Sequence, residues 1–256
     1  MKLWSESWTN GDRIPARYAA GRPDGRGGAT FGDNLNPHLA WSELPEGAKS
    51  MVLICHDFDV PLDGRDVNQP GRELAADLER SDFFHWVLVD LPPRPTVIAE
   101  GEFSRGFVAR GKPGPECANG ARQGLNDYTK WFAGDAQMTG NYFGYDGPFP
   151  PLNDTLVHHY VFTLYALSLE RLPLEGIFDG HAVRRALAGH ALALRTSGRQ
   201  VDAQLTVTNS RVNHRRRVSA FLIINLECTA ENGLPSRTPG EALSERVSCW
   251  MLSVRG

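Results

Sequence analysis

The chain of 256 residues lacks any apolar run long enough to span a membrane, and the longest such run near its end covers only Ala220–Leu226. The first residues, Met1–Ser7, also lack the apolar core of a signal peptide. From these two absences we expect a cytoplasmic protein with no membrane span.

Cysteine is scarce, and basic charge is not in excess. The four cysteines are far apart and form no CxxC pair, which argues against a zinc knuckle or a redox motif. Cys55 lies inside an apolar run and is expected to be a small buried hydrophobe. The formal net charge of -3 argues against a general nucleic-acid binder, which normally carries a basic face.

Several catalytic motifs are missing as well. The sequence contains no HExxH motif, no GxSxG elbow, no phosphate-binding P-loop and no dinucleotide fingerprint. We therefore expect no cofactor and no evident catalytic machinery.

What the sequence does contain favours β structure. Its 26 glycines and 17 prolines indicate many turns. Three apolar, aromatic and β-branched runs predict strands over Ser50–Phe58, Phe84–Leu91 and Val157–Leu167. Asp179 can cap a helix over Asp179–Ala193, where apolar residues recur at helical spacing. The pattern predicts a mainly β fold, largely antiparallel, with peripheral helices.

Two weaker elements complete this interpretation. A short helix is possible over Glu73–Glu79, and Gln200–Thr208 alternates apolar and polar residues like a last strand.

Acidic residues follow the first strong strand directly. Side chains alternate along a strand, so Asp57 and Asp59 are expected to point the same way. Two carboxylates after an apolar run are costly unless they are paired or solvated. Taken alone, a pair of solvated acids at a strand exit explains them well.

Histidines lie at the other two strong strands. His85 begins the second strand, and a lone histidine beside an aromatic residue is usually structural. At the third strand, His158 and Tyr160 share one face, whereas His159 takes the opposite face as an ordinary polar residue.

A rigid loop precedes the third strand. Residues Gly144–Pro151 include the Gly147-Pro148 turn, and glycine lets backbone N–H groups approach a ligand closely. Successive N–H groups in such a turn can bind an anion, although most Gly-Pro loops are simply turns.

The ordered set of motifs is much more specific than any one of them. It resembles the phosphatidylethanolamine-binding protein family, also called Raf-kinase-inhibitor-protein-like, and is most similar to the prokaryotic branch. The resemblance covers roughly Leu3–Ala193, and it implies a large central antiparallel sheet, a smaller second sheet and short helices. It is carried by Asn34–Trp41, Leu44–Ser50, Asp57–Pro61, His85–Pro92, Ala99–Gly101, Gly144–Pro151 and His158–Leu167.

The resemblance also implies a ligand pocket and its occupants. The pocket residues it implies are Asp57, Asp59, His85, Gly147, Pro148, His158 and Tyr160. The expected ligand is a phosphate-type or phosphoethanolamine-type anionic small molecule, or a phospholipid head group. A kinase or a protease regulated through the pocket rim is a further partner that the family allows.

Some stretches depart from the family pattern. The acidic motif reads Asp57-Phe58-Asp59, without the usual proline between the acids, and Gly124–Gly140 is longer than in compact members and could cover the mouth as a flap. We expect one domain over residues 1–208, followed by a tail of unknown role over 209–256 that is poorly ordered and packs weakly on the domain.

The expected chemistry leaves alternatives open. Histidine and tyrosine can donate hydrogen bonds to a phosphate, and the aspartates can accept from a histidine N–H or from an ammonium group. The alternative function is a metal-dependent hydrolase in which the His/Asp cluster binds a divalent metal.

Overall fold

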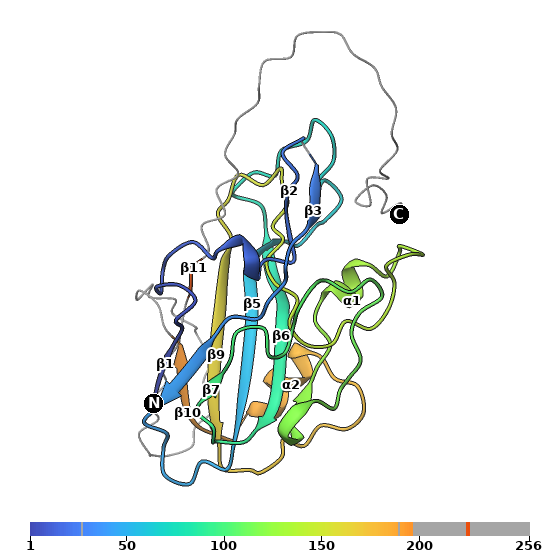
Figure 1. The fold of residues 1–256 in the computed structure, drawn as a ribbon. Helices are drawn as coiled ribbons and strands as arrows, with labels where there is room; N and C mark the ends of the chain where they lie inside the picture. Colours follow the sequence, from blue (N-terminus) through green and yellow to red (C-terminus); the bar gives the residue numbers. More distant parts are fainter. Residues whose placement is uncertain (27, 189, 197–223, 226–256) are drawn as a thin grey trace, which may run out of the picture.

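The computed structural model describes residues 1–26, 28–188, 190–196 and 224–225. Its largest unit is an antiparallel sheet with the strand order β10-β9-β5-β6-β8, in which β11 also pairs with β9 (Figure 1). The strands of this sheet are β5 (Ser50–Pro61), β6 (Arg80–Leu91), β8 (Arg122–Gln123), β9 (His159–Leu167), β10 (Ala191–Thr196) and β11 (Ile224–Asn225).

Smaller elements surround the large sheet. A second sheet has the order β1-β4-β7, and β2 and β3 form a separate hairpin. The bounds of these strands are β1 Lys2–Trp4, β2 Gly21–Pro23, β3 Ala29–Phe31, β4 Leu39–Ser42 and β7 Val97–Ile98. The described helices are short: η1 (Ala16–Tyr18), η2 (Ala118–Gly120), α1 (Tyr128–Trp131) and α2 (Gly180–Leu187). This architecture confirms the predicted mainly β fold.

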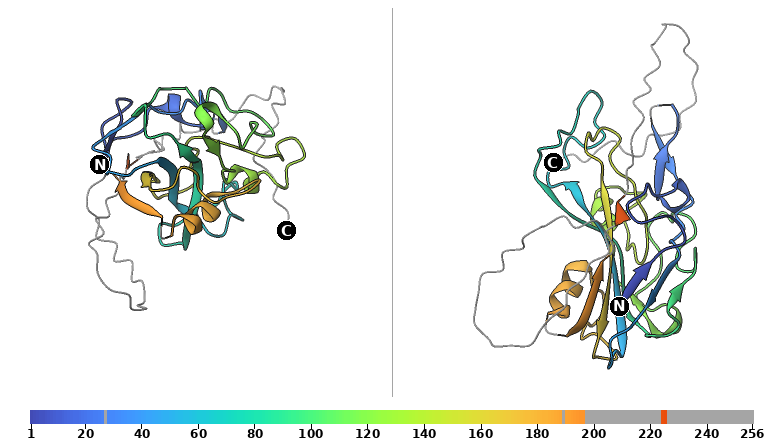
Figure 2. Two further views of the ribbon diagram at one scale, coloured as in Figure 1. Left: turned by 90° about the horizontal axis from the view of Figure 1, so that it is seen from below. Right: turned by 90° about the vertical axis from the view of Figure 1, so that its left-hand side faces the viewer.

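The central strands are apolar over most of their length because both faces of the large sheet are covered there. Helix α2 packs on one face and the small sheet lies over the other, as the right-hand view of Figure 2 shows. Along β5, Met51, Leu53 and Cys55 join the core under the small sheet, whereas Val52 and Ile54 join the core under α2. A strand buried on both faces reads as a continuous apolar run rather than an alternating one.

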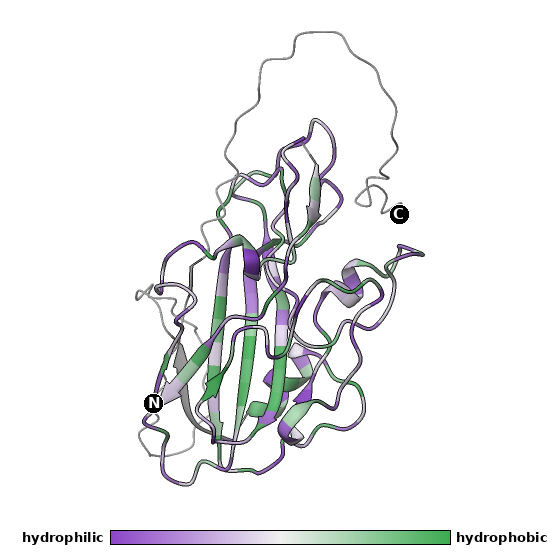
Figure 3. Ribbon diagram, in the orientation of Figure 1, coloured by the Kyte–Doolittle hydropathy of each residue, from purple (hydrophilic) through white to green (hydrophobic). Residues whose placement is uncertain are grey.

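Hydropathy changes along the length of the central strands. Figure 3 shows β5 hydrophobic over its lower part and hydrophilic toward its upper end. By alternation, Asp57 continues the face of Leu53 and Cys55, so its carboxylate points to the small-sheet side of the large sheet. The polar ends of the central strands therefore meet above the apolar core.

Two predicted elements are corrected. The helix over Asp179–Ala193 stops at Leu187, because Ala188 leaves the helical backbone region with ψ 116. Residues Ala191–Thr196 form β10 instead and pair with β9, so the alternating Ala-Leu-Ala-Leu pattern is followed rather than the helical one. The expected helix over Glu73–Glu79 is wrong: this stretch contains turns and one isolated bridge of Leu74 to Asp154.

The ends of the expected domain are only partly covered. The expected strand Gln200–Thr208 and the boundary at residue 208 lie outside the described residues. Within the expected tail, Ile224–Asn225 pairs with the start of β9, which a weakly packed tail did not anticipate.

Asp179 caps α2, because its carboxylate accepts a hydrogen bond from the Ala182 N–H at 2.9 Å. We expect Asp179→Ala to lower the free energy of unfolding by about 1 kcal/mol, the usual value of an N-cap. Asp179→Asn keeps the acceptor and should lose much less. Urea denaturation of the three proteins checks this; equal losses from both variants would show that the charge near Lys130, and not the cap, is what counts.

Candidate functional site

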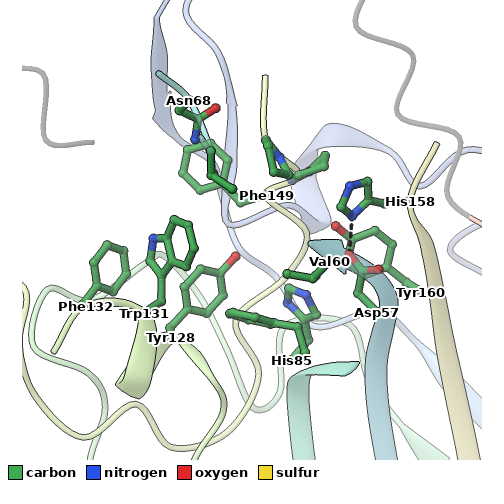
Figure 4. A pocket seen from close by; sticks show the side chains of 14 residues that line it. Asp57, Val60, Asn68, His85, Tyr128, Trp131, Phe132, Phe149, His158 and Tyr160 are labelled. Carbon is green, nitrogen blue, oxygen red and sulfur yellow. Dashed lines mark hydrogen bonds and ion pairs between the residues drawn. The ribbon is translucent and has the colours of Figure 1, made fainter. Parts of the chain in front are cut away.

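A narrow cavity lies at the polar ends of the central strands. About 40 Å³ of it is open to the centre of a water molecule. One water needs about 10–15 Å³ by this measure, so the cavity suits a group the size of about three waters. Figure 4 shows the lining side chains converging from separate segments. The lining residues are Asp57, Val60, Val67, Asn68, Phe83, His85, Tyr128, Trp131, Phe132, Phe149, Pro150, Pro151, His158 and Tyr160.

Four of the sequence-predicted residues meet in this cavity. Asp57 on β5 pairs directly with Tyr160 on β9, so their side chains share one face of the sheet. His85 comes from β6 on the other side of β5, and His158 immediately precedes β9. The His85 ring lies 5.0 Å from the Tyr160 ring, centroid to centroid.

His158 is held between two carboxylates. Its Nδ1 lies 2.6 Å from an Asp57 oxygen, and its Nε2 lies 3.1 Å from an Asp154 oxygen (Figure 4). Asp154 in turn binds the Arg80 guanidinium at 2.6 Å. An imidazole donates from both nitrogens only when it is protonated, so this geometry fits the imidazolium form. We call this chain of four charged groups, Asp57, His158, Asp154 and Arg80, the charge chain.

The charge chain governs the pKa of His158. Burial acts to lower the pKa of this histidine, but the hydrogen bonds and charges of Asp57 and Asp154 outweigh it, so the pKa lies above its usual value. Burial likewise acts to raise the pKa of Asp154, but hydrogen bonds from Arg80 and neighbours leave it below its usual value.

His85 has the opposite character. Its Nδ1 lies 2.8 Å from the Asp146 carbonyl oxygen, which can only accept, so Nδ1 carries a proton. Burial lowers the pKa of His85 in spite of the nearby Asp57 charge. The ring is therefore neutral near pH 7, and its Nε2 is a hydrogen-bond acceptor.

Asp146 is a buried anchor behind His85. Its carboxylate accepts from Asn34 at 2.7 Å, from Asn126 at 2.8 Å and from the Lys112 ammonium at 2.8 Å. Burial raises the pKa of Asp146, although Lys112 and the two amides oppose this. The network fixes the backbone carbonyl that orients His85.

Asp59 does not line the cavity, contrary to the sequence interpretation. Its carboxylate accepts from the His159 N–H at 2.7 Å and contacts His159 Nδ1 at 2.8 Å. The ladder between β5 and β6 is irregular between Asp57 and Val60, so the two acids no longer share one environment. His159 stacks on Phe58 with ring centroids 5.5 Å apart, away from the cavity-lining residues. The hydrogen bonds between Asp59 and His159 make Asp59 a structural partner of His159.

Gly147 and Pro148 lie behind the cavity wall rather than on it. The Gly147 N–H donates to Asn34, and a Cβ at Gly147 would lie 2.0 Å from the Tyr18 carbonyl oxygen. The N–H groups of Gly144 and Asp146 also donate within the protein, so these groups do not form the expected anion-binding turn.

The lining part of this loop is Phe149–Pro151. The prolines have no N–H, so the Phe149 N–H is the one backbone donor of this segment. It makes no hydrogen bond to another residue in the part of the chain that the structure describes.

Aromatic residues after Gly124 form a second wall that sequence reasoning identified only as a flap. Tyr128, Trp131 and Phe132 come from α1 and its C-terminus and line the cavity. Their spacing of three and four residues places them on one side of a helical turn, a signal that could have identified them. The Tyr128 hydroxyl donates to the Gly147 carbonyl oxygen at 2.9 Å, and burial raises the pKa of this tyrosine.

Residues 62–79, here called the cover loop, connect β5 to β6 and contribute Val67 and Asn68 to the cavity lining. The Asn68 N–H donates to the Asn153 side chain at 2.8 Å, and the Leu152 N–H donates back to the Asn68 side chain at 2.7 Å. Arg80 at the end of this loop belongs to the charge chain. Asp154 contacts both the cover loop and Arg80. The sequence interpretation missed it, because an aspartate in a loop, four residues before a histidine, has no distinctive sequence signal.

The site gives the metallohydrolase alternative no support. Both nitrogens of His158 already face carboxylates, which leaves no lone pair for a metal in the imidazolium form. Across the described ranges, no group of three or more His, Cys, Asp or Glu side chains is arranged to hold a metal ion.

None of the helices in the described part is long and apolar enough to cross a membrane.

The fold and site define an antiparallel β protein with a small cavity at the ends of its central strands, lined mainly by apolar side chains with a few polar groups among them. Residues 4–199 match the phosphatidylethanolamine-binding protein family. The chain is 33% identical over 193 residues to the UPF0098 protein YbhB of Escherichia coli K12, covering 75% of this chain and 94% of that protein. It is 30% identical over 193 residues to a UPF0098 protein of Aquifex aeolicus, covering 75% and 83% respectively.

A solved structure agrees. The crystal structure of E. coli YbcL, described as a new member of the mammalian PEBP family, aligns with a TM-score of 0.53 at 26% identity. The alignment covers 75% of this chain and 92% of that one. The chain belongs to the phosphatidylethanolamine-binding protein family, as the ordered motifs predicted.

We expect His158→Gln to lower the free energy of unfolding by about 3 kcal/mol or more at pH 5–6, because it removes the cation between two buried carboxylates. The folded pKa of His158 lies above the usual 6.5, so its stabilising contribution is complete below that pH and is lost as pH rises through the folded pKa. The difference between wild type and variant should therefore shrink toward high pH.

Urea denaturation across this pH range measures the difference. His181→Gln, at an exposed position on α2, is the matched control and should leave the profile unchanged. A difference that is constant with pH would contradict the imidazolium assignment.

Proposed function

We propose that the chain is a binding protein whose cavity takes a small phosphate-type or phosphoethanolamine-type group. The observation that carries this proposal is the convergence of Asp57, His85, His158 and Tyr160, from three segments, on one small cavity. Membership of the phosphatidylethanolamine-binding protein family supports the ligand class. The small size of the cavity agrees with a head group rather than a whole lipid.

The groups at the cavity have different roles in binding. His85 offers an acceptor at the cavity through Nε2, while His158 is committed to the two carboxylates. The aromatic wall of Tyr128, Trp131 and Phe132 excludes water and strengthens polar contacts inside. His158 therefore positions Asp57 rather than contacting the ligand.

Regulation of a kinase or a protease, which the family resemblance allows, would use the rim of the same cavity. Asn68 of the cover loop, Trp131 and Pro150 come from three segments that line this cavity, so a partner bound at its opening would contact segments that also meet the ligand. We propose no particular target.

We expect His85→Ala to weaken the binding of phosphoethanolamine by about 1.5–3 kcal/mol, the usual value of a hydrogen bond to a charged group. Isothermal titration calorimetry measures this. His159→Ala is the matched control, because His159 stacks on Phe58 and does not line the cavity. Equal losses from both variants, or no binding by the wild-type protein, would refute the proposal.

A further inference from the structure

A second hollow lies at the base of the cover loop, where the chain leaves β5 and returns to β6. About 170 Å³ of it is open to the centre of a water molecule. One water needs about 10–15 Å³ by this measure, so the hollow has room for a large side chain. Its lining, here called the loop groove, consists of Pro61, Leu62, Asp63, Leu78 and Glu79, and none of these residues lines the cavity.

Two leucine side chains form the apolar part of the loop groove. Leu62 is 58% exposed and Leu78 is 42% exposed. The Leu62 N–H donates to the Glu79 carbonyl oxygen at 2.9 Å, which holds the two ends of the loop together. Single apolar side chains scattered over a surface need no explanation, but two that line one hollow are typical of a surface that binds another molecule.

The cover loop carries an excess of negative charge. Its charged residues are five acids and two arginines. Both arginines are already used, because Arg65 pairs with Asp63 and Arg72 pairs with Asp66. No hydrogen bond or ion pair to another described residue engages the remaining carboxylates, which all lie exposed. These are the carboxylates of Glu73, Asp77 and Glu79.

The leucines and the free carboxylates together specify the kind of partner. Arginine and lysine have long apolar stems that can lie on Leu62 and Leu78 while their charged heads reach Asp77 and Glu79. An acidic segment would be repelled. A second copy of this chain that used the same surface would place carboxylates against carboxylates, because a two-fold interface brings a surface against itself.

We propose that the loop groove is a docking site for a basic peptide segment of a partner protein, in which arginine or lysine residues flank an apolar side chain such as leucine. The groove shares no lining residue with the cavity, so this inference does not rest on the proposed function. The cover loop would then meet the partner through its two ends, while its Val67 and Asn68 line the cavity.

A labelled peptide tests the proposal by fluorescence anisotropy with the full-length protein. The probe is an end-capped Arg-Arg-Leu-Leu-Arg-Arg peptide that carries fluorescein. We expect it to bind, and to bind more weakly as sodium chloride is raised from about 0.05 M to about 0.3 M, because salt screens exposed charges. The same peptide with glutamate in place of arginine should not bind.

Removal of the leucines tests the apolar part of the groove. Leu62→Ala combined with Leu78→Ala should weaken binding of the probe by about fivefold or more, because less apolar surface is covered in the complex. Both side chains are exposed, so we expect the variant to fold. Ile177→Ala is the matched control, since Ile177 is also 58% exposed but lies outside the groove, and it should leave binding unchanged.

Neutralising the free carboxylates tests the charge. Asp77→Asn combined with Glu79→Gln should weaken binding of the probe by about threefold or more, and should reduce its dependence on salt. Glu175→Gln is the matched control, because Glu175 is an exposed acid in the segment between β9 and α2. Equal losses from the groove variants and the controls would show a general attraction to the net charge of -3 and would overturn the proposal.

The chain itself contains a basic run, Arg215-Arg216-Arg217, which lies outside the described residues. A full-length variant with all three replaced by glutamine is therefore titrated beside the wild type. Binding by both proteins, lost in the groove variants, supports the proposal. Binding only after the replacement assigns the groove to this run and overturns the assignment to a partner. Binding by neither protein overturns the docking site.

Discussion

The charge chain of Asp57, His158, Asp154 and Arg80 is the interaction on which the rest of the site depends. It joins the end of β5, the segment before β9, and the start of β6, so three separate parts of the chain meet through it. Buried charges are tolerated only when each has a partner, and here each carboxylate has a cation beside it. The charge chain sets the protonation of His158 and the orientation of Asp57. It therefore sets the chemistry that the cavity presents.

The fold that positions the charge chain was largely predictable from the sequence. The runs in β5, β6 and β9 are buried on both faces, so burial and β propensity indicate the same structure. The helix after Asp179 was predictable at its start, because the cap is a local interaction. Its end was not, because the residues after Ala188 fit a helix and a strand equally well, and only pairing with β9 selects the strand.

The candidate site was predictable to the extent that it follows from strand alternation. Asp57 and Tyr160 come together because they are paired residues in adjacent strands. Strand alternation placed Asp59 wrongly. The ladder with β6 is irregular beside this residue, and its carboxylate accepts from the N–H of His159 instead. Asp154 and the Phe149 N–H lie in loops, where position depends on long-range contacts that no local pattern records. The family resemblance could name the pocket but not these supporting groups.

The cover loop is fastened by the groups that shape the cavity. The Asn68 N–H donates to the Asn153 side chain, the Leu152 N–H donates to the Asn68 side chain, and Arg80 binds Asp154 at the end of the loop. Asp154 is shared by the charge chain and by the contacts of this loop, so a substitution that breaks the charge chain also removes a contact at the end of the loop.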